Sequence, residues 1–241
     1  VSIHGGGLES YDFHALEVLE SIVESRSGGE TGIASIELLI GDAFHKAKRE
    51  GRWSNELVEA AMKAESKMSV SRQPWPKKGV FAKPPVTEEK HGRPPRPTGS
   101  HAIIVNYKDG LKATIVKEKA SSDRWNFACR TVDAAAPQAT AFFNSPWGNR
   151  GLFKALSHAI QQMFITGKES YPVERTLLTT GAVEATMRSY EQGGAVIATP
   201  ELEFDWVPYD WSAMQENGDT WKKITVETQQ PVEFRPGEPF K

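Results

Sequence analysis

The change from helical to strand-like hydrophobic periodicity near residue 100 is the feature that most constrains this fold. The segment HAIIVNYKDGLKATIVKEK, residues 101–119, holds two β-rich runs joined at Asp109-Gly110. An Asp-Gly pair favours a tight hairpin in which both turn positions take positive φ. Two further β-rich runs follow, WNFACRTV at 125–132 and ATAFFNSP at 139–146. Together these runs predict a four-stranded antiparallel meander.

The segments on either side of the meander have helical patterns. Residues 11–26 place apolar side chains at helical spacing, and Glu17, Glu20 and Glu24 fall on the other side of the expected helix. Gly28-Gly29 ends this helix, and GIASIELLI, residues 32–40, predicts a strand. Further helices are expected at 42–50, 55–66, 152–164 and 176–192, followed by a last strand at 195–199.

An antiparallel sheet combined with separate helices predicts an α+β fold. We expect a largely antiparallel open β-sheet with the helices packed on one face. The other face is then free for a ligand, a partner subunit or both. Residues 1–205 are expected to form a single domain with a proline-rich extended arm at 71–99, and residues 206–241 form a tail without an assigned structure. The opening VSIHGGG reads as the end of a strand, which predicts that the sequence begins inside a longer protein.

Composition excludes several classes of partner. The net charge of −2, with both signs mixed along the chain, gives no electrostatic basis for binding nucleic acid or an anionic membrane. The sequence has no apolar run of membrane-spanning length and no signal peptide pattern at its start. Cys129 is the only cysteine, so no disulfide forms within the chain and a cytoplasmic location is expected.

His14 is the first candidate for catalysis, because it stands in the first turns of the helix that follows the glycine turn. A histidine exchanges a proton with a hydroxyl near neutral pH, which is the task of a general acid or base. The other interpretation is a structural histidine at the sheet edge. His4-Gly5-Gly6-Gly7 lacks the G-x-G-x-x-G pattern, so no cofactor-binding residue is predicted. His4, His14 and Glu17 lack the paired histidines of a helical zinc motif, so no metal site is predicted.

One long segment carries a family resemblance. YPVERTLLTTGAVEATMRSYEQGGAVIATPELEF, residues 171–204, resembles the end of the substrate-binding half of the Gfo/Idh/MocA oxidoreductases. GDAFHKAKREGRWSNELVEAA, NYKDGLKATIV and WNFACR resemble segments of one branch of that family, in the same order. The resemblance implies the substrate-binding and oligomerising portion of an NAD(P)-dependent oxidoreductase that acts on a sugar or polyol. It also implies that NAD or NADP binds mostly to an N-terminal dinucleotide-binding domain outside these residues, and that homo-oligomers form through the sheet face.

The resemblance further implies a role for His14. Many members carry Asp-x-x-x-His at the start of the corresponding helix, and His14 aligns with that histidine. Ser10 stands where the aspartate is expected, so the usual charged partner is missing; Glu9, Ser10 and Asp12 are the neighbouring substrate-binding candidates. Two alternatives stay open, a non-catalytic sugar-binding or association module of the same fold and a relative that cleaves glycosides while recycling NAD. Glu174 and Arg175 are expected to form a surface ion pair or cap, or to contact a ligand.

Overall fold

The computed structural model describes residues 1–66, 99–118, 124–143 and 149–208 and has an α+β fold. Its seven-stranded sheet has the order β6-β5-β1-β4-β3-β2-β7, and β1 beside β4 is the parallel pair in an otherwise antiparallel arrangement. The strands are β1 (Ser2–His4), β2 (Ile33–Ile40), β3 (His101–Tyr107), β4 (Lys112–Lys117), β5 (Arg124–Cys129), β6 (Gln138–Phe143) and β7 (Ile197–Ala198). The prediction of a largely antiparallel open sheet is confirmed.

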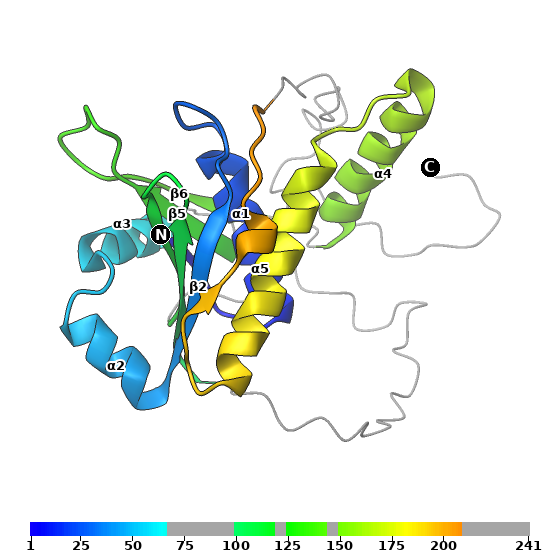
Figure 1. The fold of residues 1–241 in the computed structure, drawn as a ribbon. Helices are drawn as coiled ribbons and strands as arrows, with labels where there is room; N and C mark the ends of the chain where they lie inside the picture. Colours follow the sequence, from blue (N-terminus) through cyan, green and yellow to red (C-terminus); the bar gives the residue numbers. More distant parts are fainter. Residues whose placement is uncertain (67–98, 119–123, 144–148, 209–241) are drawn as a thin grey trace, which may run out of the picture.

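Helices cover both faces of this sheet (Figure 1). The helices are α1 (Ser10–Val23), α2 (Gly41–Arg49), α3 (Asn55–Ser66), α4 (Asn149–Thr166) and α5 (Val173–Glu191). Helices α1 and α5 pack side by side on one face, whereas α2 and α3 lie on the other. Along β3, Ile103 and Val105 face the first layer of helices, and Ala102 and Ile104 face the second.

The expectation that helices pack on one face is therefore wrong. The central strands are apolar on both sides, as the run Ala102, Ile103, Ile104, Val105 shows, and each of these side chains is at most 5% exposed. Uninterrupted apolar runs are typical of strands that are buried on both faces. The middle of the sheet face that was expected to serve a ligand or a partner subunit is covered by α2 and α3.

The predicted meander is also interrupted. β1 inserts between β4 and β5, pairing parallel with the first and antiparallel with the second. A three-residue strand gives too weak a pattern to predict its partners. At the hairpin between β3 and β4, Gly110 has φ 90°, whereas Asp109 does not take a positive φ. The connection runs from residue 108 to residue 111, so it is longer than the two-residue turn that Asp-Gly predicted. Within it, the Asp109 carboxylate accepts a hydrogen bond from the N–H of Leu111.

Helix α1 and its C-cap bury three acidic side chains, two of which, Glu20 and Glu24, the apolar pattern had placed on the other side of the helix. Asp12, Glu20 and Glu24 are each at most 1% exposed. Burial raises the pKa of Glu20 well above its ordinary value, and nearby Glu30 raises it further. Tyr107 donates a hydrogen bond to this carboxyl group. Apolar periodicity did not predict this burial, because the compensating groups come from distant segments.

Glu24 is compensated by a buried ion pair. The guanidinium of Arg175 donates to both carboxylate oxygens of Glu24, and Trp206 Nε1 donates to Glu24 Oε2 at 3.2 Å. The Tyr171 ring lies 4.6 Å from the Arg175 guanidinium carbon. Arg175 is 5% exposed, so the surface ion pair expected for it is instead an interior one. This contact joins the end of α1 to the start of α5 and to the segment after β7.

Several predicted segments lie outside the described residues. These are the proline-rich arm up to residue 98 and the tail from residue 209 onward. Before the tail, Trp206 pairs with Glu30 in an isolated antiparallel bridge. Within the described ranges, no helix combines the length and apolar character needed to span a membrane.

Arg175→Met should lower the free energy of unfolding by roughly 3–5 kcal/mol, because it leaves the Glu24 carboxylate buried without its cation. Urea unfolding followed by circular dichroism measures the change. Arg188→Met is the matched control, since Arg188 is 41% exposed where it pairs with Glu184 and Glu201, and less than about 1 kcal/mol is expected. Equal losses of unfolding free energy in the two variants would show that the pair of Glu24 with Arg175 is no more stabilising than a surface ion pair.

Candidate functional site

The most unusual polar cluster lies where β1 ends, α1 begins and β3 begins. His4 is the last residue of β1, His101 is the first of β3, and both stand opposite Lys117 of β4 in the register of the sheet. Asp12 descends from the first turns of α1 between the two histidines. All three side chains are at most 1% exposed. We call this set the Asp12 cluster.

Asp12 accepts hydrogen bonds with both of its carboxylate oxygens. Nε2 of His4 lies 2.7 Å and Nε2 of His101 lies 2.9 Å from Asp12 Oδ1. The N–H of Glu9 donates to Asp12 Oδ2 at 2.8 Å, as part of a capping box at the start of α1. Burial alone would raise the pKa of Asp12, but the hydrogen bonds from the two histidines outweigh it and hold that pKa well below 3.8. Asp12 is therefore a buried carboxylate.

The backbone assigns a tautomer to His4. The N–H of Gly6 donates to His4 Nδ1 at 3.2 Å, so this nitrogen accepts and Nε2 carries the proton that Asp12 receives. His101 Nδ1 is buried and has no hydrogen-bond partner within the described part of the chain. His101 donates to Asp12 through Nε2, so its Nδ1 is an acceptor that receives no hydrogen bond from the described residues.

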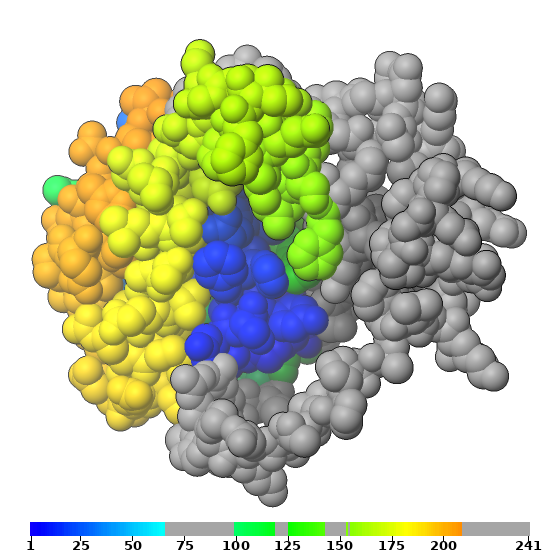
Figure 2. Space-filling view, turned by 90° about the vertical axis from the view of Figure 1, so that its right-hand side faces the viewer, coloured from blue at the N-terminus to red at the C-terminus, as the bar shows by residue number. Residues whose placement is uncertain are grey.

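His14 lies on the opposite side of the same helix turn. It is exposed, and its ring makes edge-to-face contacts with two aromatic rings. The centroid distance is 5.3 Å to Trp125 and 6.2 Å to Tyr11. Partial burial, together with the nearby His4, lowers the pKa of His14 below 6.5, which favours a neutral imidazole near pH 7. Tyr11 stacks on Trp125 at 6.0 Å, so His14 stands beside an aromatic wall. Part of α1 is visible as the blue region of Figure 2, between α5 and α4.

The sequence-predicted residues separate into two groups. His14 and Ser10 are exposed and Glu9 is partly buried, whereas Asp12 points into the interior, with both oxygens accepting from the protein. Within the described residues no hydrogen bond joins Asp12 to His14. Glu9 has φ 73°, in the left-handed region that favours glycine, which stores strain of about 1 kcal/mol at the start of α1.

The residues His4, His14 and Glu17 do not converge. Glu17 Oε1 accepts from the Thr179 hydroxyl at 2.6 Å, toward α5, and burial raises its pKa. His101 was the residue missed by sequence reasoning. It lies 89 positions from Asp12, and its only signal is a histidine in the first position of an apolar strand. The pairing of β1 and β3 with the same strand brings it to His4.

Several N–H groups of the glycine turn and of the start of α1 are used within the chain. Those of Gly6, Glu9, Ser10 and Tyr11 donate to acceptors of the chain and are not available to the diphosphate of NAD or NADP. The carboxylates of Glu9 and Asp12 at this helix start would also repel a phosphate. A Cβ built on Gly6 would lie 1.9 Å from Tyr11 Cγ, so the missing side chain makes room for the tyrosine ring.

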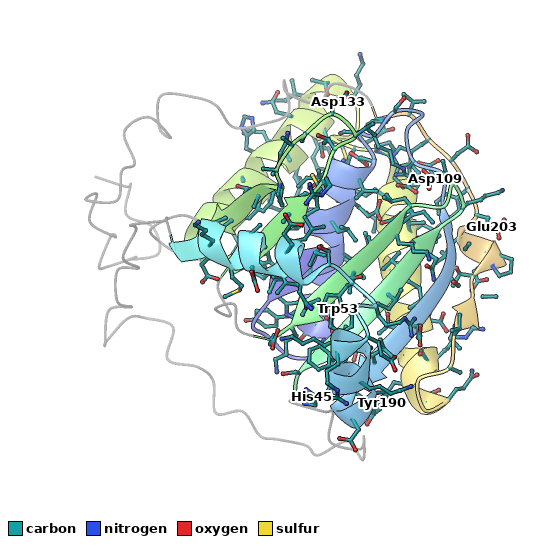
Figure 3. The ribbon with its side chains drawn as sticks, turned by 90° about the vertical axis from the view of Figure 1, so that its left-hand side faces the viewer. His45, Trp53, Asp109, Asp133, Tyr190 and Glu203 are labelled. Carbon is teal, nitrogen blue, oxygen red and sulfur yellow. The ribbon has the colours of Figure 1, made fainter. Side chains whose placement is uncertain are left out.

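A hollow lies between α2 and α3, on the face of the sheet opposite α1. Its volume is about 360 Å³, and its lining includes Ile3, Met62 and the ion pair of Lys48 with Glu118, in which Nζ and Oε1 are 2.5 Å apart. Trp53 and His45 mark the α2 side of this face in Figure 3. The hollow contains none of the histidines described above, so it is separate from the aromatic wall at His14.

Comparison with family models, curated proteins and solved structures finds no match for this chain. The resemblance of residues 171–204 to the Gfo/Idh/MocA oxidoreductases stays a prediction.

Asp12→Asn should lower the free energy of unfolding at pH 7 by at least about 2 kcal/mol, because an amide nitrogen would face the Glu9 N–H. The native carboxylate has a lowered pKa, so its contribution to the free energy of unfolding is fully present above about pH 5 and is lost as the pH falls through that lowered pKa. The difference between wild type and variant should therefore shrink below about pH 5. Urea unfolding across this pH range measures it.

Asp133→Asn is the control for this measurement, since Asp133 is exposed. It should change stability by less than about 0.5 kcal/mol at any pH. An Asp12→Asn effect that stays constant from pH 7 to pH 3 would show that the carboxylate is not the stabilising group.

Proposed function

We propose that this chain is the substrate-binding and assembly portion of an NAD(P)-dependent oxidoreductase that acts on a sugar or polyol. The observation that supports it is the exposed His14 beside the wall formed by Tyr11 and Trp125. A neutral imidazole accepts a proton from a hydroxyl, and aromatic rings pack against the apolar face of a sugar ring. His14 is the proposed general base in this reaction.

The oxidant in this proposal is NAD or NADP, held by a dinucleotide-binding domain outside the described residues. When bound, the cofactor supplies the hydride acceptor. The residues of this chain contribute orientation and proton transfer. The Asp12 cluster fixes the first turn of α1 from below, so that His14 Nδ1 and Nε2 keep their place beside Trp125. The Trp125 ring excludes water from one side of the imidazole.

A non-catalytic sugar-binding module of the same fold is the second candidate. The observation that favours it is the use of Asp12: its carboxylate binds His4 and His101, and within the described ranges no hydrogen bond joins an acid to His14. Ser10, at the position where the family has aspartate, is exposed and carries no charge. Under this candidate His14 and Trp125 bind a sugar and no turnover occurs.

Calorimetric titration with a panel of aldoses and polyols, using the protein encoded by the whole gene, tests the binding that both candidates require. We expect saturable binding of one class of sugar, weakened about 3- to 10-fold by Trp125→Leu because a stacked aromatic ring contributes roughly 0.5–1.5 kcal/mol. Trp53→Leu on the far face is the matched control. If no sugar in the panel binds, both candidates fail.

His14→Ala in the same whole protein should lower turnover with NAD or NADP at least tenfold while leaving the circular dichroism spectrum unchanged. The base must be neutral, so wild-type kcat/KM should rise with pH, with the midpoint of the rise below pH 6.5, in the direction of the lowered pKa. His45→Ala, at an exposed position on α2, should retain full activity. Sugar binding without any turnover in the wild type would select the non-catalytic module.

A further inference from the structure

We propose that the Asp12 cluster is a binding site for a divalent transition-metal ion of the zinc type. The donor atoms of His4, Asp12 and His101 all lie within 4.8 Å of one another. They come from β1, α1 and β3, and both imidazoles approach through Nε2. This site is inferred without the proposed oxidoreductase activity, because its three side chains are buried and His14 is not among the donors.

The donor set selects the class of ion. Two imidazole nitrogens and one ionised carboxylate form a ligand set that suits zinc and cobalt, whereas calcium and magnesium take oxygen ligands almost entirely. The carboxylate charge also offsets half of the charge of a divalent cation in the interior.

The orientation of the Asp12 carboxylate fits a ligand that binds through one oxygen. Oδ2 is held by the Glu9 N–H at 2.8 Å, and Oδ1 is the atom at which both histidines meet. Hydrogen bonding of the second oxygen is the usual support for a ligating carboxylate. The lone pair of Oδ1 thus points toward the space between the two rings.

Binding requires a rearrangement of protons. An ion takes the Nε2 lone pair of each neutral histidine, so the proton on each Nε2 moves to Nδ1 of the same ring. His101 Nδ1 has no partner among the described residues, so it is available for this proton. His4 Nδ1 accepts from Gly6, so the Gly5-Gly6 peptide must turn to present the Gly5 carbonyl, a movement that glycine tolerates.

The ion would be structural in its effect. It would replace two hydrogen bonds to Asp12 by bonds that join β1, α1 and β3, and a ligand that binds the folded state alone raises its stability. The competing explanation is a hydrogen-bonded cluster that takes up no ion. Metal titration distinguishes the two, because hydrogen bonding alone predicts no dependence of stability on zinc.

The test uses the full 241-residue chain, purified without a histidine tag and stripped with a chelator. Calorimetry with Zn²⁺ should show one equivalent bound, and Co²⁺ should give visible absorption bands typical of a nitrogen and oxygen site. Zn²⁺ should raise the urea midpoint of unfolding, and EDTA should reverse that rise. Absence of both binding and stabilisation in the wild type overturns the proposal, whatever the variants do.

His101→Gln is the informative variant, since it keeps a donor for Asp12 but removes the imidazole. Loss of a ligand should weaken Zn²⁺ binding by at least about 100-fold, more than the roughly 10- to 100-fold effect of losing a residue that only hydrogen-bonds to a ligand. His45→Gln, an exposed histidine on α2, should bind as the wild type does. Binding that survives His101→Gln and is lost in His45→Gln would assign the ion to the surface and overturn the proposal.

Discussion

The burial of the Asp12 carboxylate is the constraint on which the start of this fold depends. A charge removed from water is costly unless its hydrogen bonds are replaced, and here three donors replace them. Two of the donors belong to strands on either side of β4, so the carboxylate can be satisfied only when β1 and β3 are both in place. The short strand β1, with three residues, gains from Asp12 a tertiary anchor that its own ladder hydrogen bonds do not supply.

The same helix solves the problem of buried acids in three different ways. The two imidazoles that donate to Asp12 hold its pKa low, whereas burial and the nearby Glu30 raise the pKa of Glu20. Glu24 stays beside Arg175, which comes from a different helix. Glu20 lies eight residues after Asp12 and Glu24 four residues after Glu20, so each lies toward the same side of α1 as the one before it. Polar contacts of this kind fix one orientation of the helix, whereas apolar packing tolerates several.

Sequence periodicity predicted most helices and strands of this chain but not their neighbours. The runs at 55–66 and 101–107 have the expected type because their side-chain spacing reflects local geometry. The insertion of β1 between β4 and β5 depends on pairings between distant segments, and so does the meeting of His4 with His101. The acids of α1 were placed on the solvent side for the same reason: a pattern that counts apolar residues does not register a partner more than 80 positions away, such as Tyr107 for Glu20.

The position of His14 follows from the Asp12 cluster by helix geometry. Two residues apart on an α-helix is a rotation of about 200°, so a turn that directs residue 12 into the interior directs residue 14 outward. The hydrogen bonds that bury Asp12 therefore also set the exposure of His14 and its contact with Trp125. A change at the Asp12 cluster that shifted the first turn of α1 would also shift the imidazole of His14, because both side chains belong to that turn. This geometric link holds whichever chemistry His14 performs.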